Sequence, residues 1–243
     1  MRNILPPVFS VLLATAASSF SSTLITSEQF TSISPQLQSR IVIQQTTGTA
    51  SANVRYATGS GYYTVFQTFT WTGDYGMTGL GVKLVANSNN ISSTTPLSYY
   101  LRILSVESVE AGSAVTATVG DYFFELTGNY KTVDDYLYFI LPDTLNLSNG
   151  GAYAFQIVAG GTYSTRLTLA TAQGGTSDYA GGNGFSAGSS LALPDNDIPT
   201  TISGTPVNGY VFFATAAIPE AGSTLLLLSG LSAGTVAAYC RRR

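Results

Sequence analysis

The catalytic chemistry open to this chain is carboxylate chemistry, because the sequence contains no histidine. Nucleophilic catalysis by Ser-His-Asp or Cys-His groups needs an imidazole base, and common catalytic zinc sites use histidine ligands. Glycoside hydrolysis needs only two acids, about 5 to 9 Å apart, on either side of the scissile bond. The candidate acids are Glu107, Glu110, Glu125, Asp134 and Asp135. No motif pairs them, so a secreted carboxylate-dependent glycan hydrolase stays an alternative interpretation.

Carboxylates also bind calcium, and the segment "PDND" places Asp195 and Asp197 close together. Such a segment supplies two or three of the six to eight oxygen ligands that Ca²⁺ takes, and it lacks the spacing of an EF-hand loop. A turn is therefore the favoured interpretation. The sequence also has no P-loop and no dinucleotide-binding motif. We expect no metal and no cofactor.

A long Gly/Ser/Asn/Pro-rich passage, Ala172–Gly209, holds the candidate binding residues. Loops of this length are usually functional or disordered. In the functional interpretation Tyr179 and Phe185 are glycan contacts that stack on a sugar face, with Asp178 and Asn183 supplying polar groups. In the alternative, which we favour, the passage is a surface crossover whose aromatic side chains pack back onto the edge of the domain.

The elements that must position these residues are short strands. Apolar residues alternate along nine segments rich in Tyr, Phe, Val, Ile and Thr, and turn-forming Gly, Asn and Asp separate them. The expected strands are Arg40–Gln45, Tyr62–Trp71, Leu80–Ala86, Ser98–Glu107, Tyr122–Gly128, Tyr136–Leu141, Ala152–Ala159, Ser164–Ala170 and Gly209–Thr215. This pattern predicts an all-β, antiparallel two-sheet sandwich with a jelly-roll-like topology over residues 18–217. No internal repeat indicates a propeller or β-helix.

The N-terminus has the pattern of a secretory signal peptide. Met1–Asn3 gives a short positive region, Ile4–Leu13 is mostly apolar, and Ala14–Ala16 has the small residues of a cleavage site. We expect residues 1–17 to be removed on export.

The C-terminus predicts one transmembrane helix. Ser223–Tyr239 is a run of seventeen residues without a formal charge, which as a helix spans roughly 25 Å, close to the thickness of a bilayer core. Arg241, Arg242 and Arg243 follow, and a basic cluster beside an apolar segment stays in the cytoplasm. The domain before the helix would then lie outside the cell.

The order of these features resembles the PEP-CTERM sorting signal, over residues 218–243. Pro219 and Glu220 match the first two motif positions, Ala221 replaces the usual second proline, and the apolar helix and terminal arginines follow. The resemblance implies an exported protein of Gram-negative, exopolysaccharide-producing bacteria, recognised and cut at the motif by the membrane enzyme exosortase. The segments "DYAGGN" and "GYVFFAT" also resemble the end of the β-sandwich domains that other proteins with this tail carry.

Charge and cysteine content narrow the function classes. Without the two ends, the chain keeps six basic and twelve acidic residues, a net charge of −6. An acidic surface without a basic stripe argues against nucleic-acid binding. The single cysteine, Cys240, lies beside the terminal arginines, so the exported domain has no disulfide and depends on its hydrophobic core.

These observations favour a non-catalytic exported protein of the cell surface or exopolysaccharide matrix, with a structural or carbohydrate-contacting role. The expected partners are an exosortase-type processing enzyme, extracellular polysaccharide and, before processing, the membrane. A protein permanently anchored by an uncut tail is the other alternative.

Overall fold

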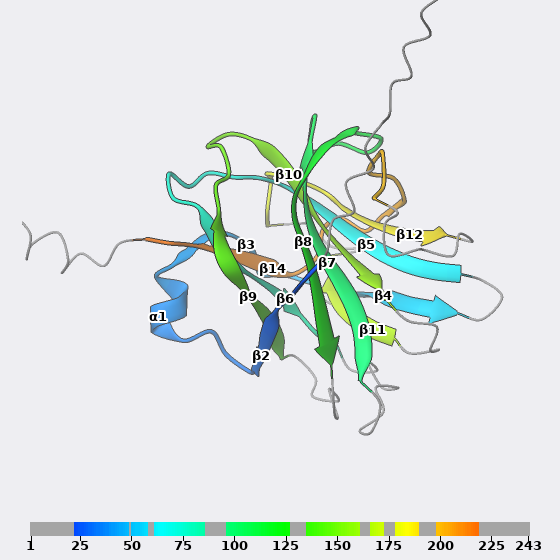
Figure 1. Cartoon of the computed structure of the whole chain (residues 1–243), viewed down its shortest axis with the longest axis horizontal. Helices are drawn as coiled ribbons and strands as arrows, with labels where there is room; N and C mark the ends of the chain where they lie inside the picture. Colours follow the sequence, from blue (N-terminus) through cyan, green and yellow to red (C-terminus); the bar gives the residue numbers. More distant parts are fainter. Residues whose placement is uncertain are drawn as a thin grey trace, which may run out of the picture.

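A computed structural model describes residues 22–48, 50–57, 61–85, 96–126, 135–160, 166–172, 178–189 and 198–218 (Figure 1). These residues form an all-β fold whose only described helix is the four-residue α1, Pro35–Gln38. No helix among the described residues has the length and apolar character needed to cross a membrane. The expected signal peptide and transmembrane helix lie outside the described residues.

The strands form two sheets. The larger sheet contains, in spatial order, β1 (Thr23–Leu24), β8 (Val115–Leu126), β7 (Leu97–Val106), β10 (Ala152–Ala159), β5 (Gly61–Thr70), β12 (Gly184–Ser189) and β13 (Thr205–Pro206), with β4 (Ala50–Ala57) pairing both β5 and β11 (Arg166–Thr171). The smaller sheet has the order β2 (Thr26–Phe30), β9 (Tyr136–Leu145), β6 (Met77–Lys83), β14 (Phe212–Ala216) and β3 (Ile41–Gln45). All described strand pairs are antiparallel except β1 with β8, which is parallel.

The strand pairs nest one inside another along the chain. The hairpin β7–β8 is innermost and belongs to the larger sheet, and β6 pairs with β9 in the smaller sheet. Outside these, β5 pairs with β10 in the larger sheet and β3 with β14 in the smaller. A further nested pair, β4–β11, lies between these two pairs along the chain and also belongs to the larger sheet. Both sheets therefore contain strands from distant parts of the chain.

Successive side chains of a strand point to opposite faces of its sheet. The inward-facing apolar side chains of both sheets fill one main core between them. In β9, Leu137 and Phe139 are fully buried in that core, whereas Tyr136 and Tyr138 belong to the opposite, outer face. Trp71, the chain's one tryptophan, is also fully buried there. A second, smaller core lies on the outer face of the larger sheet, where Phe66 of β5 and Phe185 of β12 pack with Ile202.

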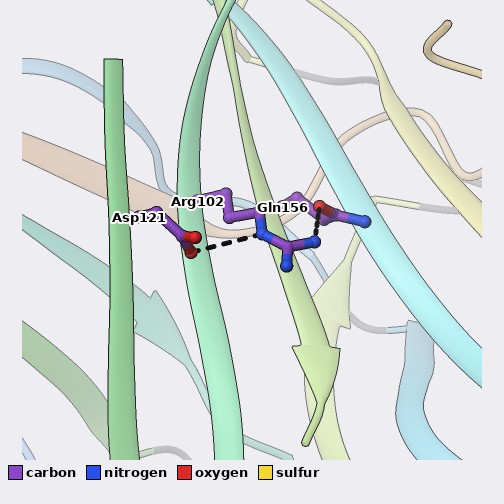
Figure 2. A network of polar contacts seen from close by, with 3 residues as sticks. All are labelled: Arg102, Asp121 and Gln156. Atoms are coloured by element: carbon purple, nitrogen blue, oxygen red, sulfur yellow. Dashed lines mark hydrogen bonds and ion pairs between the residues drawn. The ribbon is translucent and has the colours of Figure 1, made fainter. Parts of the chain in front are cut away.

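The outer face of the larger sheet also holds a buried ion pair (Figure 2). The Arg102 Nε lies 3.2 Å from Oδ1 of Asp121 on β8, and its Nη1 lies 3.4 Å from Oε1 of Gln156 on β10. The guanidinium also lies 5.5 Å from the centre of the Tyr100 ring. Burial raises the pKa of Asp121, and the nearby Arg102 charge opposes that shift without cancelling it.

The expected all-β, antiparallel class is confirmed, and each of the nine expected strands overlaps a strand of the structure. The passage Ala172–Gly209 is not one uninterrupted loop, because its described parts contain β12 and β13. β12 forms through pairing with β5 across six residues, despite its Gly/Ser-rich sequence. Tertiary pairing thus overrides the low strand propensity of that sequence.

Candidate functional site

Several residues singled out from the sequence lie outside the described residues. They are the sorting-signal residues Pro219, Glu220, Ala221, Arg241, Arg242 and Arg243, the calcium candidates Asp195 and Asp197, and the acid Asp134. Among the described residues, no group of three His, Cys, Asp or Glu side chains could hold a metal ion.

The candidate glycan contacts Tyr179 and Phe185 face inward. Phe185 is only 2% exposed. The Tyr179 ring packs edge-on against Phe212 at 5.5 Å, and its hydroxyl lies 3.0 Å from the backbone N–H of Thr70. Burial accordingly raises the pKa of Tyr179. These contacts agree with the alternative interpretation, in which the aromatic side chains of this passage pack onto the sandwich.

Asp178 and Asn183, the polar residues named with these aromatics, make hydrogen bonds within the protein. The Asp178 carboxylate accepts hydrogen bonds from the backbone N–H groups of Thr46 and Thr47 and from the Thr46 hydroxyl. Burial tends to raise the pKa of Asp178, but these hydrogen bonds outweigh it and lower the pKa. The backbone N–H of Asn183 donates to the Thr68 hydroxyl at 2.8 Å. Asp178 therefore fixes the passage to the segment that follows β3, and Asn183 fixes it to β5.

Three of the described candidate acids, Glu107, Glu110 and Glu125, are divided between the two ends of β7. Glu125 lies opposite Ser98 at the start of β7, whereas Glu107 and Glu110 follow the other end of that strand. At about 3.3 Å per residue, a ten-residue strand separates these positions by roughly 30 Å. Asp135 is buried, and its Oδ2 accepts a hydrogen bond from Nε2 of Gln29 at 2.7 Å.

The structure instead contains a hollow of about 660 Å³ on the outer face of the smaller sheet, which we call the groove. The groove is lined by Glu28, Phe30, Ser32, Ser34, Gln36, Leu37, Arg40, Thr78, Tyr138, Ile140 and Leu141. Helix α1 forms part of its border: the Ser34 side chain accepts a hydrogen bond from the Leu37 N–H, and Pro35 follows as a favoured first helical residue.

Four rings on this face form what we call the aromatic cluster: Phe30, Tyr136, Tyr138 and Phe213. Phe30 stacks on Tyr136 with ring centres 6.0 Å apart, and Tyr138 stacks on Phe213 at 5.6 Å. Phe30 links the two pairs, since its centre lies 6.2 Å from that of Tyr138. Phe30 and Tyr138 line the groove, while the almost fully buried Phe213 supports them from behind.

Two glycines of β6 make room for these rings. A β-carbon at Gly79 would lie 2.3 Å from the Tyr138 hydroxyl oxygen, and one at Gly81 would lie 2.1 Å from the Phe213 ring. The rings therefore lie directly over the β6 backbone, in space that any other residue type would fill. This explains why "MTGLGVK" has glycine at two alternating positions of a central strand.

A chain of hydroxyl groups runs beneath the groove. The Arg40 Nη2 donates to Thr78 Oγ1 at 3.3 Å, and Thr78 Oγ1 lies 3.2 Å from Thr215 Oγ1. The Tyr138 hydroxyl lies 3.0 Å from Thr215 Oγ1, which donates to the Gly79 carbonyl at 3.4 Å. In the Thr78–Thr215 and Tyr138–Thr215 contacts either hydroxyl can be the donor, because each oxygen both donates and accepts.

Strand irregularities coincide with this polar chain. The pairing of β14 shifts register on both sides of Thr215, and that of β6 shifts between Met77 and Gly79. Bulges of this kind redirect side chains and are enriched beside functional sites. Here they bring Thr78, Thr215 and Tyr138 within hydrogen-bond distance from three different strands.

The groove was not predicted from the sequence, although its signal was present. In "YLYFIL" both alternating faces are apolar or aromatic, so Tyr136, Tyr138 and Ile140 had to face something other than the main core. The contribution of Phe30 was less visible, because "TSEQF" has few apolar residues and was not expected to be a strand.

Comparison with protein-family models, with curated proteins and with solved structures found no significant match to this chain.

Proposed function

We propose that this chain is a non-catalytic exported protein of the cell surface or exopolysaccharide matrix, and that it contacts polysaccharide through the groove. The observation that supports this most strongly is the combination of the aromatic cluster with a hydroxyl chain in one open hollow. A sugar unit has an apolar C–H face and a rim of hydroxyl groups, so it needs these two kinds of contact together.

The groove offers both kinds of contact. Phe30 and Tyr138 provide ring surface against which the apolar face of a sugar can be buried. Arg40, Gln36 and the serines supply hydrogen-bond donors, and Glu28 with the Tyr138 oxygen supplies acceptors. The volume of the groove, about 660 Å³, falls within the usual range of ligand sites. Such sites combine apolar walls with a few precisely placed polar groups.

A binding role fits the groove better than hydrolysis. Of the residues that line it, Glu28 alone carries a carboxylate. Retaining and inverting glycosidases both use a pair of acids. The site therefore has the contacts for holding a glycan and only half of the usual acid pair for cleaving one.

The topology supports the jelly-roll interpretation. Four nested antiparallel pairs, β7–β8, β6–β9, β5–β10 and β3–β14, alternate between the two facing sheets, as the strands of a jelly roll do. A fifth nested pair, β4–β11, is added to the larger sheet between the last two. The groove lies on the sheet that contains the outermost of these pairs.

Export would use the two ends of the chain. Residues 1–17 act as the signal peptide, and Pro219, Glu220 and Ala221, with the apolar segment and Arg241, Arg242 and Arg243, act as a PEP-CTERM-type address for an exosortase-type enzyme. The last described strand, β14, ends at Ala216, two residues before the segment that carries the motif. Processing at this motif would release the β domain from the membrane with the groove intact.

Affinity electrophoresis tests the binding role. The purified protein is run through gels that contain hydroxyethyl cellulose, dextran, galactomannan or alginate. We expect at least one polymer to retard it, and Phe30→Ala to weaken the retardation by losing ring surface. Phe123→Ala is the matched control, because Phe123 is a half-buried phenylalanine that packs on Tyr100 of the other sheet. Retardation by none of the polymers, or equal retardation of both variants, would overturn the proposal.

A further inference from the structure

A second hollow, of about 350 Å³, lies between strands of the larger sheet, and we call it the polar pocket. It is lined by Ser51, Ala52, Asn53, Tyr63, Ser186, Gly188, Thr205 and Val207. These residues belong to β4, β5 and β12, and to β13 and the residue after it. In Figure 1, β4 and β12 lie toward the right-hand side of the view, and α1, which borders the groove, lies toward the left-hand side. The elements that border the two hollows therefore lie toward opposite ends of the molecule, and they belong to different sheets.

The polar pocket differs from the groove in its chemistry. Five of its described lining residues carry a hydroxyl or amide group, and none of the described ones carries a formal charge at neutral pH. Asn53 accepts a hydrogen bond from Thr168 Oγ1 at 3.0 Å, which orients its amide with Nδ2 directed away from Thr168. The Nδ2 hydrogens have no partner among the described residues. Asn53 thus keeps two donors in a fixed orientation.

One aromatic ring completes the lining. Tyr63 packs over Gly188, where a β-carbon would lie 3.2 Å from the ring. Tyr63, Asn53 and Ser186 are half-buried, and Ser51 and Thr205 are exposed at the surface. The pocket therefore combines one supported ring with several groups that both donate and accept hydrogen bonds. The described lining residues include no cation to pair with a phosphate, sulfate or uronate group.

We propose that the polar pocket is a second carbohydrate site, specific for uncharged sugar units, and that the two sites let one molecule bridge two polysaccharide chains. The bridging role depends on the proposed function of the groove, whereas sugar binding in the pocket does not. Because the residues that line the two sites belong to different sheets of the β domain, we expect that one short stretch of glycan cannot fill both. Two weak sites on one body increase retention by about 10²- to 10⁴-fold when both engage a polymer.

Two variants disable the pocket with little risk to the fold. Ser51→Tyr places a large side chain at the mouth from an exposed strand position, where tyrosine is a favoured residue. Asn53→Ala removes the two oriented donors. Phe30→Ala disables the groove alone. Unfolding followed through the Trp71 emission verifies that each variant is folded.

The test combines affinity electrophoresis with the viscosity of hydroxyethyl cellulose, dextran and galactomannan solutions. We expect wild-type protein to raise the viscosity of the polymer that retards it. Ser51→Tyr and Asn53→Ala should abolish this increase and weaken retardation at least tenfold, while Phe30→Ala should abolish the increase and leave residual retardation through the pocket.

The outcomes separate the two proposals. If the pocket variants behave as wild type while Phe30→Ala abolishes retardation, the pocket and the bridging role are wrong and the proposed function of the groove stands. If Phe30→Ala behaves as wild type while Ser51→Tyr abolishes retardation, the groove proposal is wrong and the pocket stands as the sugar site. If none of these neutral polymers retards the wild-type protein, the pocket proposal is overturned.

Discussion

The ring of Tyr138 lies over Gly79, so closely that a β-carbon at position 79 would come within 2.3 Å of the tyrosine oxygen. Two adjacent strands, β9 and β6, therefore share one surface, to which β9 contributes the ring and β6 the space for it. The same ring reaches Thr215 of β14 through its hydroxyl. The shape of the groove thus depends on the absence of a side chain as much as on the residues that line it.

Gly79→Ala should displace the Tyr138 ring and weaken polysaccharide binding about tenfold, or roughly 1.4 kcal/mol. The added methyl should also lower the free energy of unfolding by about 1 to 3 kcal/mol, because the packed ring must move. Gly160→Ala is the matched control, since a β-carbon there meets the Tyr100 ring at 2.8 Å, away from the groove. Equal binding by the two variants would show that the position of the Tyr138 ring is unimportant.

The Arg102–Asp121 pair makes a prediction about stability. Asp121→Ala leaves the guanidinium of Arg102, which is 1% exposed, without its carboxylate partner. We expect a loss of about 3 kcal/mol in the free energy of unfolding, measured by urea denaturation with Trp71 emission as the probe. Adding Arg102→Met should recover at least half of that loss, because the buried positive charge is then removed as well. Additive losses in the double variant would contradict this explanation.

The lowered pKa of Asp178 predicts that the free energy of unfolding depends on pH. Its hydrogen bonds lower the pKa of the folded carboxyl below the usual 3.8, so the folded state binds fewer protons than the unfolded state between the two values. The resulting stabilisation is complete above the unfolded pKa and is lost as pH falls through the folded one. The difference in unfolding free energy between wild type and Asp178→Asn should therefore be constant from pH 5 to 7 and shrink below about pH 4. A difference that does not change with pH would count against this assignment.

The sorting tail predicts a change in mass. In the native host, the mature protein should lack Arg243 by intact-mass analysis. Glu220→Gln, or serine in place of Arg241, Arg242 and Arg243, should give a membrane-retained form that is heavier by the mass of the tail. Wild-type protein that keeps Arg243 and stays in the membrane fraction would instead support the permanently anchored alternative.

The sequence was sufficient for the class of fold and for the well-patterned strands. Segments such as "AYAFQIVA" are rich in strand-forming residues, and β10 has the bounds expected for it, Ala152–Ala159. β4 ("ASANVRYA") and β12 ("GFSAGS") were missed because Ala, Ser, Asn and Gly have low strand propensity, and pairing with β11 and β5 determines their structure. The short β1, β13 and α1 have too few residues to show any period.

The site was harder to predict, because it is assembled across strands that are distant in sequence. Tyr179 and Phe185 stood out as aromatics in a glycine-rich passage, yet both pack inward. Phe30 and Tyr138, which line the groove, come from β2 and β9, more than a hundred residues apart. Which aromatic faces outward depends on sheet order and on the glycines of the neighbouring strand, and neither can be derived from local pattern.

The central claim is that sugars bind in the groove, and the most direct test is an NMR titration with oligosaccharides of the polymer that retards the protein. Ring-proton resonances of Phe30 and Tyr138 should shift saturably with sugar concentration, while those of Phe155, fully buried in the main core, should not. Shifts confined to residues outside the groove, or no saturable shift at Phe30 and Tyr138, would contradict the account.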